Sequence, residues 1–184
     1  MRGVHERPEG LRHVDAVLEP DEERELLDRL TGLELREVRL HGQVARRTVR
    51  DYGVSYDFAS ATVSPGEPVP AWLEPLRTRC AALLDRPADT LAEALVTRYP
   101  PSATIGWHRD APAFGDVVGV SLASVCALRF QRGKGPERRV FELHLQPRSA
   151  YVLAGRARTV WQHSIPAVPA ERWSVTFRTL RRPV

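Results

Sequence analysis

The chain has 184 residues, of which 42% are hydrophobic and 27% charged, and its formal net charge is +4. This length and composition fit one soluble globular domain with a real core, and no apolar run is long enough to span a membrane. The start of the chain, Met1 to Arg7, lacks the apolar core of a signal peptide, so we expect a cytoplasmic protein. Cys80 and Cys126 form no CxxC pair, which argues against a thiolate metal site.

The excess of positive charge comes almost entirely from arginine, because Lys134 is the single lysine. A basic surface suits a polyanionic partner such as DNA or RNA. A GC-rich genome that favours arginine codons explains the same composition. The sequence has no uninterrupted basic tail, which would have favoured the nucleic-acid interpretation, so both interpretations stay open.

The first half of the chain predicts helices and a hairpin. Residues 1–19 are polar and are interpreted as a lead-in with one edge strand. Pro20 to Glu23 opens a helix, because acidic residues in a first turn interact favourably with the helix dipole, and Gly32 is a suitable residue to end it. The other expected elements of this half are strands at 35–40 and 43–50 with a turn at His41–Gly42, a loop at 62–70 and a helix at 71–84.

From Glu93 onward, short strand-like runs follow one another, separated by glycine, proline or charged turns. No helical pattern interrupts them, which disfavours a parallel sheet with crossover helices. A series of short strands with such turns predicts a barrel or a double-sheet jelly roll. The expected strands are 94–99, 105–108, 117–122, 126–131, 140–145, 150–153, 158–163 and 173–180.

The candidate metal ligands are His108, Asp110 and His163. Residues i and i+2 of an extended segment point to the same side, so His108 and Asp110 can converge on one ion. Two imidazoles and one carboxylate on one face are typical of a non-haem iron(II) site with open positions. The alternative for the first two residues is a hydrogen-bonded pair at a strand end. His144 is interpreted as an outward-facing or hydrogen-bonded strand residue.

A second candidate group lies near the C-terminus, where Arg172, Ser174 and Arg178 share one face of a predicted strand. Guanidinium groups bind carboxylates through two parallel hydrogen bonds, so a dicarboxylate such as 2-oxoglutarate would satisfy both arginines. The phenol of Tyr99 could donate a hydrogen bond to the same carboxylate. The alternatives are a solvated edge strand for the arginines and an ordinary half-buried strand position for Tyr99.

These residues together resemble the AlkB family of Fe(II)- and 2-oxoglutarate-dependent dioxygenases. The matching features are Thr97-Arg98-Tyr99, the His108-x-Asp110 pair, His163, and the ending RWSVTFR from Arg172 to Arg178. The likeness covers roughly residues 45–180. It implies a fold that is α+β and mainly β, a double-stranded β-helix or jelly-roll barrel with the N-terminal helices packed on one outer side.

The resemblance also implies roles for individual residues. His108, Asp110 and His163 would bind Fe(II), with 2-oxoglutarate and O₂ as co-substrates. Tyr99 and Arg172 would hold the distal carboxylate of 2-oxoglutarate. The remaining implied co-substrate residues are Arg178 near the keto-acid end, Ser174, and Thr97. Many family members carry Asn where Thr97 stands, and a hydroxyl replaces only part of an amide's hydrogen bonding, so we expect weaker co-substrate binding.

The substrate is less defined than the chemistry. DNA-repair members carry an acidic residue soon after the His-x-Asp pair, whereas the nearest acid here is Asp116. In the lack of an acidic residue soon after the His-x-Asp pair, the chain resembles the bacterial relatives and the tRNA-modifying animal homologue. The family's substrate lid corresponds to residues 43–58, in which basic side chains can hold phosphates and aromatic ones can stack on a flipped base. The candidates are Arg46, Arg47, Tyr52 and Tyr56, and the alternative is an amphipathic hairpin with outward arginines.

The resulting expectation is an enzyme that oxidatively demethylates alkylated bases in DNA or RNA. We expect one domain over residues 1–184, with helices and a lid hairpin in 1–92 and the jelly-roll catalytic core in 93–180. We also expect a nucleic-acid partner, no association with a membrane, and a monomeric state. The alternatives are the same oxygenase chemistry on a protein or small molecule, and a jelly-roll binding module without catalysis.

Overall fold

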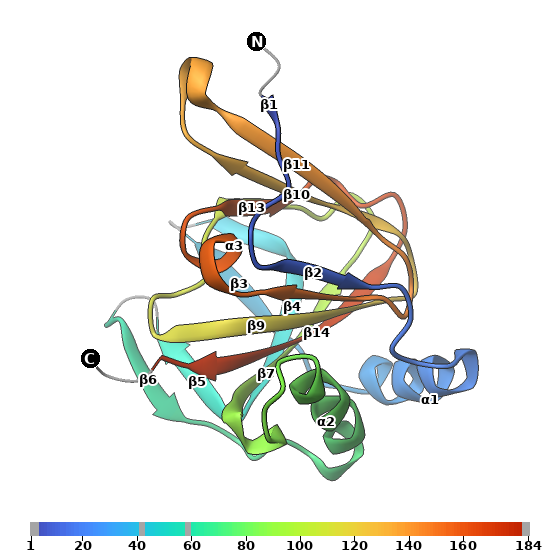
Figure 1. The fold of residues 1–184 in the computed structure, drawn as a ribbon. Coiled ribbons are helices and arrows are strands. Elements are labelled where there is room, and N and C mark those ends of the chain that lie inside the picture. The colour runs from blue at the N-terminus through green and yellow to red at the C-terminus, as the bar shows by residue number, and fades with distance from the viewer. Residues whose placement is uncertain (1–3, 41–42, 58–59, 182–184) are drawn as a thin grey trace.

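Two β-sheets packed face to face form the body of the protein (Figure 1). The computed structural model describes residues 4–40, 43–57 and 60–181. The five-stranded sheet has the order β1-β11-β10-β13-β8, and the seven-stranded sheet has the order β2-β12-β9-β14-β7-β4-β3. The strands are β1 Val4–His5, β2 Leu11–Val14, β3 Arg36–Leu40, β4 Gln43–Tyr52, β5 Val54–Asp57, β6 Thr62–Pro65, β7 Leu91–Tyr99, β8 Ile105–His108, β9 Phe114–Leu122, β10 Cys126–Arg132, β11 Arg139–Leu145, β12 Ala150–Leu153, β13 Gln162–Ile165 and β14 Arg172–Leu180.

Two hydrophobic clusters lie on the two faces of the seven-stranded sheet. The inner cluster joins side chains of both sheets, such as Leu153 of β12 and Phe130 of β10, and thus holds the sheets together. The outer cluster packs the sheet against helices α1 (Pro20–Thr31) and α2 (Glu74–Ala82). The predicted arrangement, with the N-terminal helices on one outer side, agrees with this layering (Figure 1).

Helix α1 begins where the sequence predicts, at Pro20, and Gly32 caps its C-terminus. The backbone N–H of Glu19 donates to the Glu22 carboxylate at 2.8 Å, which satisfies one N–H group at the helix start. Its buried face consists of Leu26 and Leu30.

Most predicted strands are confirmed, but four local predictions were wrong in part. The lead-in contains two strands, β1 and β2, and part of the predicted loop at 62–70 is strand β6, which pairs with β5. Residues 71–84 divide into a 3₁₀ turn at Ala71–Leu73 and helix α2, because Pro75 lacks an N–H and fits the first turn of a helix. The predicted strand at 158–163 is partly helix α3 (Gly155–Thr159), followed by β13. The predicted turn at His41–Gly42 lies outside the described residues.

The N-terminal segment connects the free edges of both sheets. Strand β1 pairs with β11 in the five-stranded sheet, and β2 pairs with β12 in the seven-stranded sheet. Between them, the Glu6 carboxylate accepts a hydrogen bond from Arg132 at 2.7 Å. Two edges that would otherwise expose unpaired backbone groups are thereby covered.

Strand β4 belongs to the main sheet, where it pairs with β7 from Thr48 to Tyr52. Gly53 then turns the chain out of the sheet with a φ of +83°, and a Cβ there would lie 2.0 Å from the Ala92 carbonyl oxygen, so glycine is required. The β5-β6 hairpin that follows forms a separate two-stranded sheet. Among the described residues, no helix is long and apolar enough to cross a bilayer.

Candidate metal and co-substrate site

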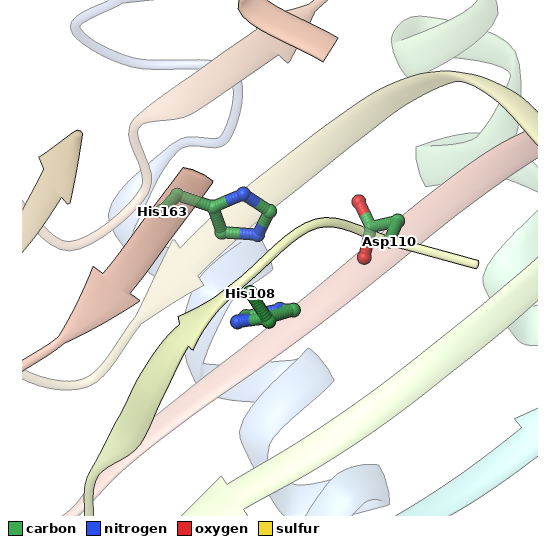
Figure 2. Close-up of side chains that lie close together, drawn as sticks. All are labelled: His108, Asp110 and His163. Carbon is green, nitrogen blue, oxygen red and sulfur yellow. The ribbon is translucent and has the colours of Figure 1, made fainter. Parts of the chain in front are cut away.

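The three predicted metal ligands converge at one end of the sheet pair. Strand β8 ends at His108, Asp110 follows two residues later, and His163 lies opposite His108 in the adjacent strand β13. The possible ligand atoms of the three side chains lie within 4.8 Å of one another. Figure 2 shows the two imidazoles and the carboxylate facing a common space. We define His108, Asp110 and His163 as the ligand triad.

The orientation of His108 is fixed by its own strand. Its Nδ1 lies 2.9 Å from the carbonyl oxygen of Gly106. A carbonyl can only accept, so Nδ1 carries the proton and Nε2 keeps its lone pair for a metal. A backbone carbonyl that binds the second ring nitrogen is a common way to hold a ligating histidine.

Electrostatics keep the other two ligands in the protonation states that a metal requires. Burial lowers the pKa of His163 to about 4, so its imidazole is neutral at pH 7. Burial alone would raise the pKa of Asp110, but the Arg178 guanidinium pulls this pKa well below its usual range. A neutral imidazole and an ionised carboxylate are both electron-pair donors, which fits Fe(II).

Arg178 connects the triad to a carboxylate that the sequence did not indicate. Its Nη2 donates to Asp110 Oδ1 at 3.1 Å, and its Nη1 donates to Glu93 of β7. Glu93 is 4% exposed and lies directly opposite Arg178 in the sheet. Burial alone would lower the pKa of Arg178, but the carboxylates of Glu93 and Asp110 raise it above its usual value. Glu93 stands among apolar residues at the start of β7, and a charge in that setting is the signal that could have identified it.

Arg172 lies in the interior of the protein and not on a solvated edge strand. Strand β14 is central, with β7 and β9 on its two sides, and Arg172 is 1% exposed. Its Nε donates to Ser121 Oγ at 3.0 Å, and its guanidinium lies 4.8 Å from the centre of the Tyr99 ring. The buried Nη1 has no hydrogen-bond partner in the described part of the chain. A buried guanidinium with one N–H group left without an acceptor suits an anionic ligand, and a carboxylate of 2-oxoglutarate would be such an acceptor.

Buried hydroxyl groups form a row beside Arg172. Thr97 of β7, Ser174 of β14 and Ser121 of β9 are direct cross-strand neighbours, and all three are less than 5% exposed. Residues directly opposite each other in a sheet place their side chains on the same face. The predicted co-substrate residues Thr97 and Ser174 therefore lie on the face that carries Tyr99 and Arg172.

The four predicted substrate residues do not lie together. Tyr56 of the β5-β6 hairpin lines a cavity next to the triad. Arg46 is exposed and donates to the Pro101 carbonyl at 3.3 Å. Arg47 is half-buried near Tyr99, and burial lowers the pKa of its guanidinium. Tyr52 is 6% exposed and belongs to the outer core cluster, so its ring is not available to a substrate.

The cavity beside the triad has a volume of about 420 Å³. Asp110 forms part of its wall, which links the cavity to the metal ligands. The side chains around Asp110 are mostly basic or aromatic. The lining residues are Tyr56, Arg109, Asp110, Ala111, Pro112, Arg158, Thr159 and Arg181.

Arg158 of helix α3 has a structural role that the sequence did not indicate. Its guanidinium donates to the carbonyl oxygens of Ala111, Phe114 and Gly115, each at 2.8 Å. These carbonyls belong to the segment that follows Asp110. Arg158 therefore ties that segment to the helix that leads into His163. It was predicted to lie in a strand, and this helical turn was missed.

Comparisons with known proteins agree with this geometry. The model of the 2OG-Fe(II) oxygenase superfamily matches residues 10–178. The mouse protein tRNA (carboxymethyluridine(34)-5-O)-methyltransferase ALKBH8 is 27% identical over 175 residues, which cover 89% of this chain and 25% of the mouse protein. Its Xenopus tropicalis counterpart is 28% identical over 167 residues, which cover 86% of this chain and 25% of the relative. The chain thus spans about a quarter of the length of these relatives.

Solved structures confirm the fold. The structure of OsALKBH1 superposes with a TM-score of 0.72 at 15% identity, covering 95% of this chain and 98% of that one. An oxidoreductase of the 2OG-Fe(II) oxygenase family from Burkholderia pseudomallei superposes with a TM-score of 0.63 at 17% identity, covering 99% of this chain and 97% of that one. With the match of the family model, these findings identify the chain as an AlkB-like member of the 2OG-Fe(II) oxygenase superfamily, a family of dioxygenases that use Fe(II), 2-oxoglutarate and O₂.

Proposed function

We propose that this protein removes N-methyl groups from alkylated bases in DNA or RNA. When bound at the triad, Fe(II) supplies the oxidising chemistry: one oxygen atom of O₂ enters succinate as 2-oxoglutarate loses carbon dioxide, and the other hydroxylates the methyl carbon. The hydroxymethyl group then leaves as formaldehyde. His108, Asp110 and His163 would hold the metal, and Arg172, Tyr99 and Arg178 would hold the co-substrate.

The observation that carries the choice of substrate is the basic cavity beside Asp110. Arg109 and Arg181 line it, and in the described ranges neither forms an ion pair with a carboxylate. Guanidinium groups without an acidic partner are available for phosphates. Tyr56, in the same lining, offers a ring on which a base could stack. The tRNA in the names of the mouse and frog relatives supports a nucleic-acid substrate.

The test is formaldehyde release from single-stranded oligonucleotides that carry N-methylated adenine or cytosine, as DNA and as RNA. We expect formaldehyde and succinate in equal amounts, no formaldehyde from the unmethylated oligonucleotide, and neither product with His108→Ala. Succinate without formaldehyde from any oligonucleotide, together with no oligonucleotide binding at low salt, would assign the chemistry to a protein or small molecule. No succinate at all would support a binding module.

A variant of the cavity lining tests the phosphate contact. Arg181→Ala removes an exposed arginine whose backbone, and not its side chain, bonds to Ala113. We expect the KM for the oligonucleotide to rise about threefold to tenfold, with an unchanged KM for 2-oxoglutarate. The control is Arg24→Ala, which removes the same charge from the exposed face of α1. An equal effect of both variants would mean that the overall charge, and not the cavity, binds the substrate.

A further inference from the structure

A second hollow lies at β2, the terminal strand on one edge of the seven-stranded sheet. Its volume is about 260 Å³, and it shares no lining residue with the cavity beside the triad. Strand β2 and the segment before it supply most of its lining, and the rest comes from β12 and the end of α2. We call this space the edge hollow, and its lining residues are Arg7, Arg12, His13, Val14, Leu83 and Val152.

The edge hollow is separate from the co-substrate site. Arg12 lies directly opposite Val152, which belongs to the outer cluster, whereas Arg172 lies opposite Tyr99 of the inner cluster. Direct cross-strand neighbours share a face, so Arg12 and Arg172 project from opposite faces of the sheet. His13 is the next residue and projects to the other face than Arg12. Because β2 is an edge strand, side chains from both of its faces contribute to one hollow.

The lining of the edge hollow carries positive charge without a matching acid. Three of the six lining residues are basic and none is acidic. Arg7 is exposed, and its Nη2 donates to the Leu11 carbonyl oxygen at 3.4 Å. Arg12 is also exposed, and its guanidinium donates to the Leu83 carbonyl oxygen. Among the described residues neither arginine forms an ion pair with a carboxylate, so both retain donors for an anionic ligand.

His13 provides a second, independent indication of a ligand. Its Nδ1 lies 3.4 Å from the carboxylate of Asp15, and its side chain is 17% exposed. The other ring nitrogen, Nε2, is buried and has no hydrogen-bond partner in the part of the chain that the structure describes. A buried polar atom of this kind is normally satisfied by a bound group or an ordered water. Protonated Nε2 donates to an oxyanion, and unprotonated Nε2 accepts from the hydroxyl of a hydrogen phosphate.

We propose that the edge hollow binds a phosphate group. Two guanidinium groups and an imidazole suit an oxyanion that offers several acceptor oxygens. Pockets for drug-sized molecules measure about 300–1,000 Å³, so the smaller edge hollow favours a single phosphate group over a larger ligand. The same donors recognise a phosphomonoester, as in a nucleotide, and a phosphodiester of a nucleic-acid backbone. The proposal does not depend on the demethylation chemistry.

The experiment is a calorimetric titration of inorganic phosphate into the full metal-free chain at low ionic strength, where charge interactions are screened least. Arg7→Gln and Arg12→Gln should each raise the Kd for phosphate about tenfold, as for the loss of a charged hydrogen bond. Arg12→Lys keeps the charge but loses the planar fork, so its Kd should rise less. The control Arg29→Gln removes an exposed charge from α1 and should keep the wild-type Kd.

Arg12 also holds the end of α2 through Leu83, so Arg12→Gln could bind less phosphate because it is less stable. Arg7→Gln decides in that case, since its only hydrogen bond within the described ranges is long and a thermal unfolding curve should match that of the wild type. The proposal is overturned if the wild-type protein binds no phosphate or if Arg7→Gln and Arg29→Gln bind it equally. It is also overturned if 2-oxoglutarate displaces the phosphate, because the anion would then occupy the site at Arg172.

Two oligonucleotides of one sequence, with and without a 5′-phosphate, distinguish the sources of the phosphate group. Tighter binding of the phosphorylated one that is lost in Arg7→Gln assigns the edge hollow to phosphomonoesters. Equal binding of both that weakens in Arg7→Gln, but not in Arg29→Gln, assigns it to the backbone of a nucleic acid. If Arg7→Gln weakens only the binding of inorganic phosphate, the hollow takes small phosphate compounds. Equal weakening in Arg29→Gln would reflect the overall charge and contradict a specific site.

Discussion

Arg178 illustrates at the scale of a single residue how the site holds its charges. One guanidinium serves two buried carboxylates, the metal ligand Asp110 and the supporting residue Glu93. The side chains of all three are at most 12% exposed, so none of these charges is solvated well by water. A buried charge that loses its partner is penalised far more than a surface charge.

The substitution Glu93→Ala should therefore lower the free energy of unfolding by about 3–5 kcal/mol, because it leaves Arg178 short of a partner. Glu93→Gln, which keeps one acceptor oxygen, should cost less. The measurement is urea unfolding of the metal-free protein. The control Glu67→Ala breaks a surface pair with Arg50, and its side chain is 63% exposed, so we expect a loss of about 0–1 kcal/mol. Equal losses would mean that Glu93 contributes no more than a surface residue.

At the scale of elements, helix α3 determines how the two halves of the triad meet. Arg158 bonds to three carbonyls of the segment after Asp110, and β13 with His163 begins three residues after α3 ends. The short helix is therefore part of the support for the metal site. Supporting groups of this kind typically change metal affinity by one to two orders of magnitude.

Arg158→Lys tests this support, because an ammonium group cannot reproduce the planar fork that reaches three carbonyls. We expect the Kd for Mn(II), measured by calorimetry, to rise roughly tenfold to a hundredfold. Arg156→Lys is the control in the same helix, since Arg156 is exposed and its nearest carboxylate, that of Glu9, is 3.8 Å away. If Arg158→Lys binds Mn(II) as the wild-type protein does, α3 has no role in placing the ligands.

The distance in sequence between contacting residues explains which parts of the site could be predicted from the sequence. His108 and Asp110 are two positions apart, and Arg172 and Arg178 of β14 lie an even number of positions apart in one strand and so share a face, so local patterns were sufficient for them. Glu93 and Arg158 become part of the site through strand register and contacts between distant segments, which no local pattern encodes. The strand predicted at 158–163 was wrong in part for the same reason, because the hydrogen bonds of Arg158 favour a helical turn over the local alternation.

Over the whole molecule, the buried His163 makes stability depend on pH. The pKa of His163 is about 4 in the folded metal-free protein, against 6.5 as its ordinary value, because burial disfavours the charged form. The unfolded state therefore binds more protons between these two values. The stabilising contribution is fully present above pH 6.5 and is lost as the pH falls toward 4.

As the pH falls from 6.5 toward 4, we accordingly expect the free energy of unfolding of the metal-free protein to decrease. The contribution of His163 to this slope is up to about 1.4 kcal/mol per pH unit. Urea unfolding at a series of pH values from 7 to 4 measures it. His163→Asn should remove most of this slope, and added Mn(II) should shift the loss to lower pH because the metal binds the neutral imidazole. A pH dependence that is the same in His163→Asn would contradict the assignment.

The N-terminal strands have a consequence for how the chain folds. Glu6 and Arg132, which join near the edge of the five-stranded sheet, are 126 residues apart in the sequence. Segments β1 and β2 leave the ribosome long before their partners β11 and β12. Pairing over such long separations slows folding, because a long loop must close before the contact forms. The last step of folding is thus expected to be the attachment of the first strands, and until then two sheet edges stay open to other chains.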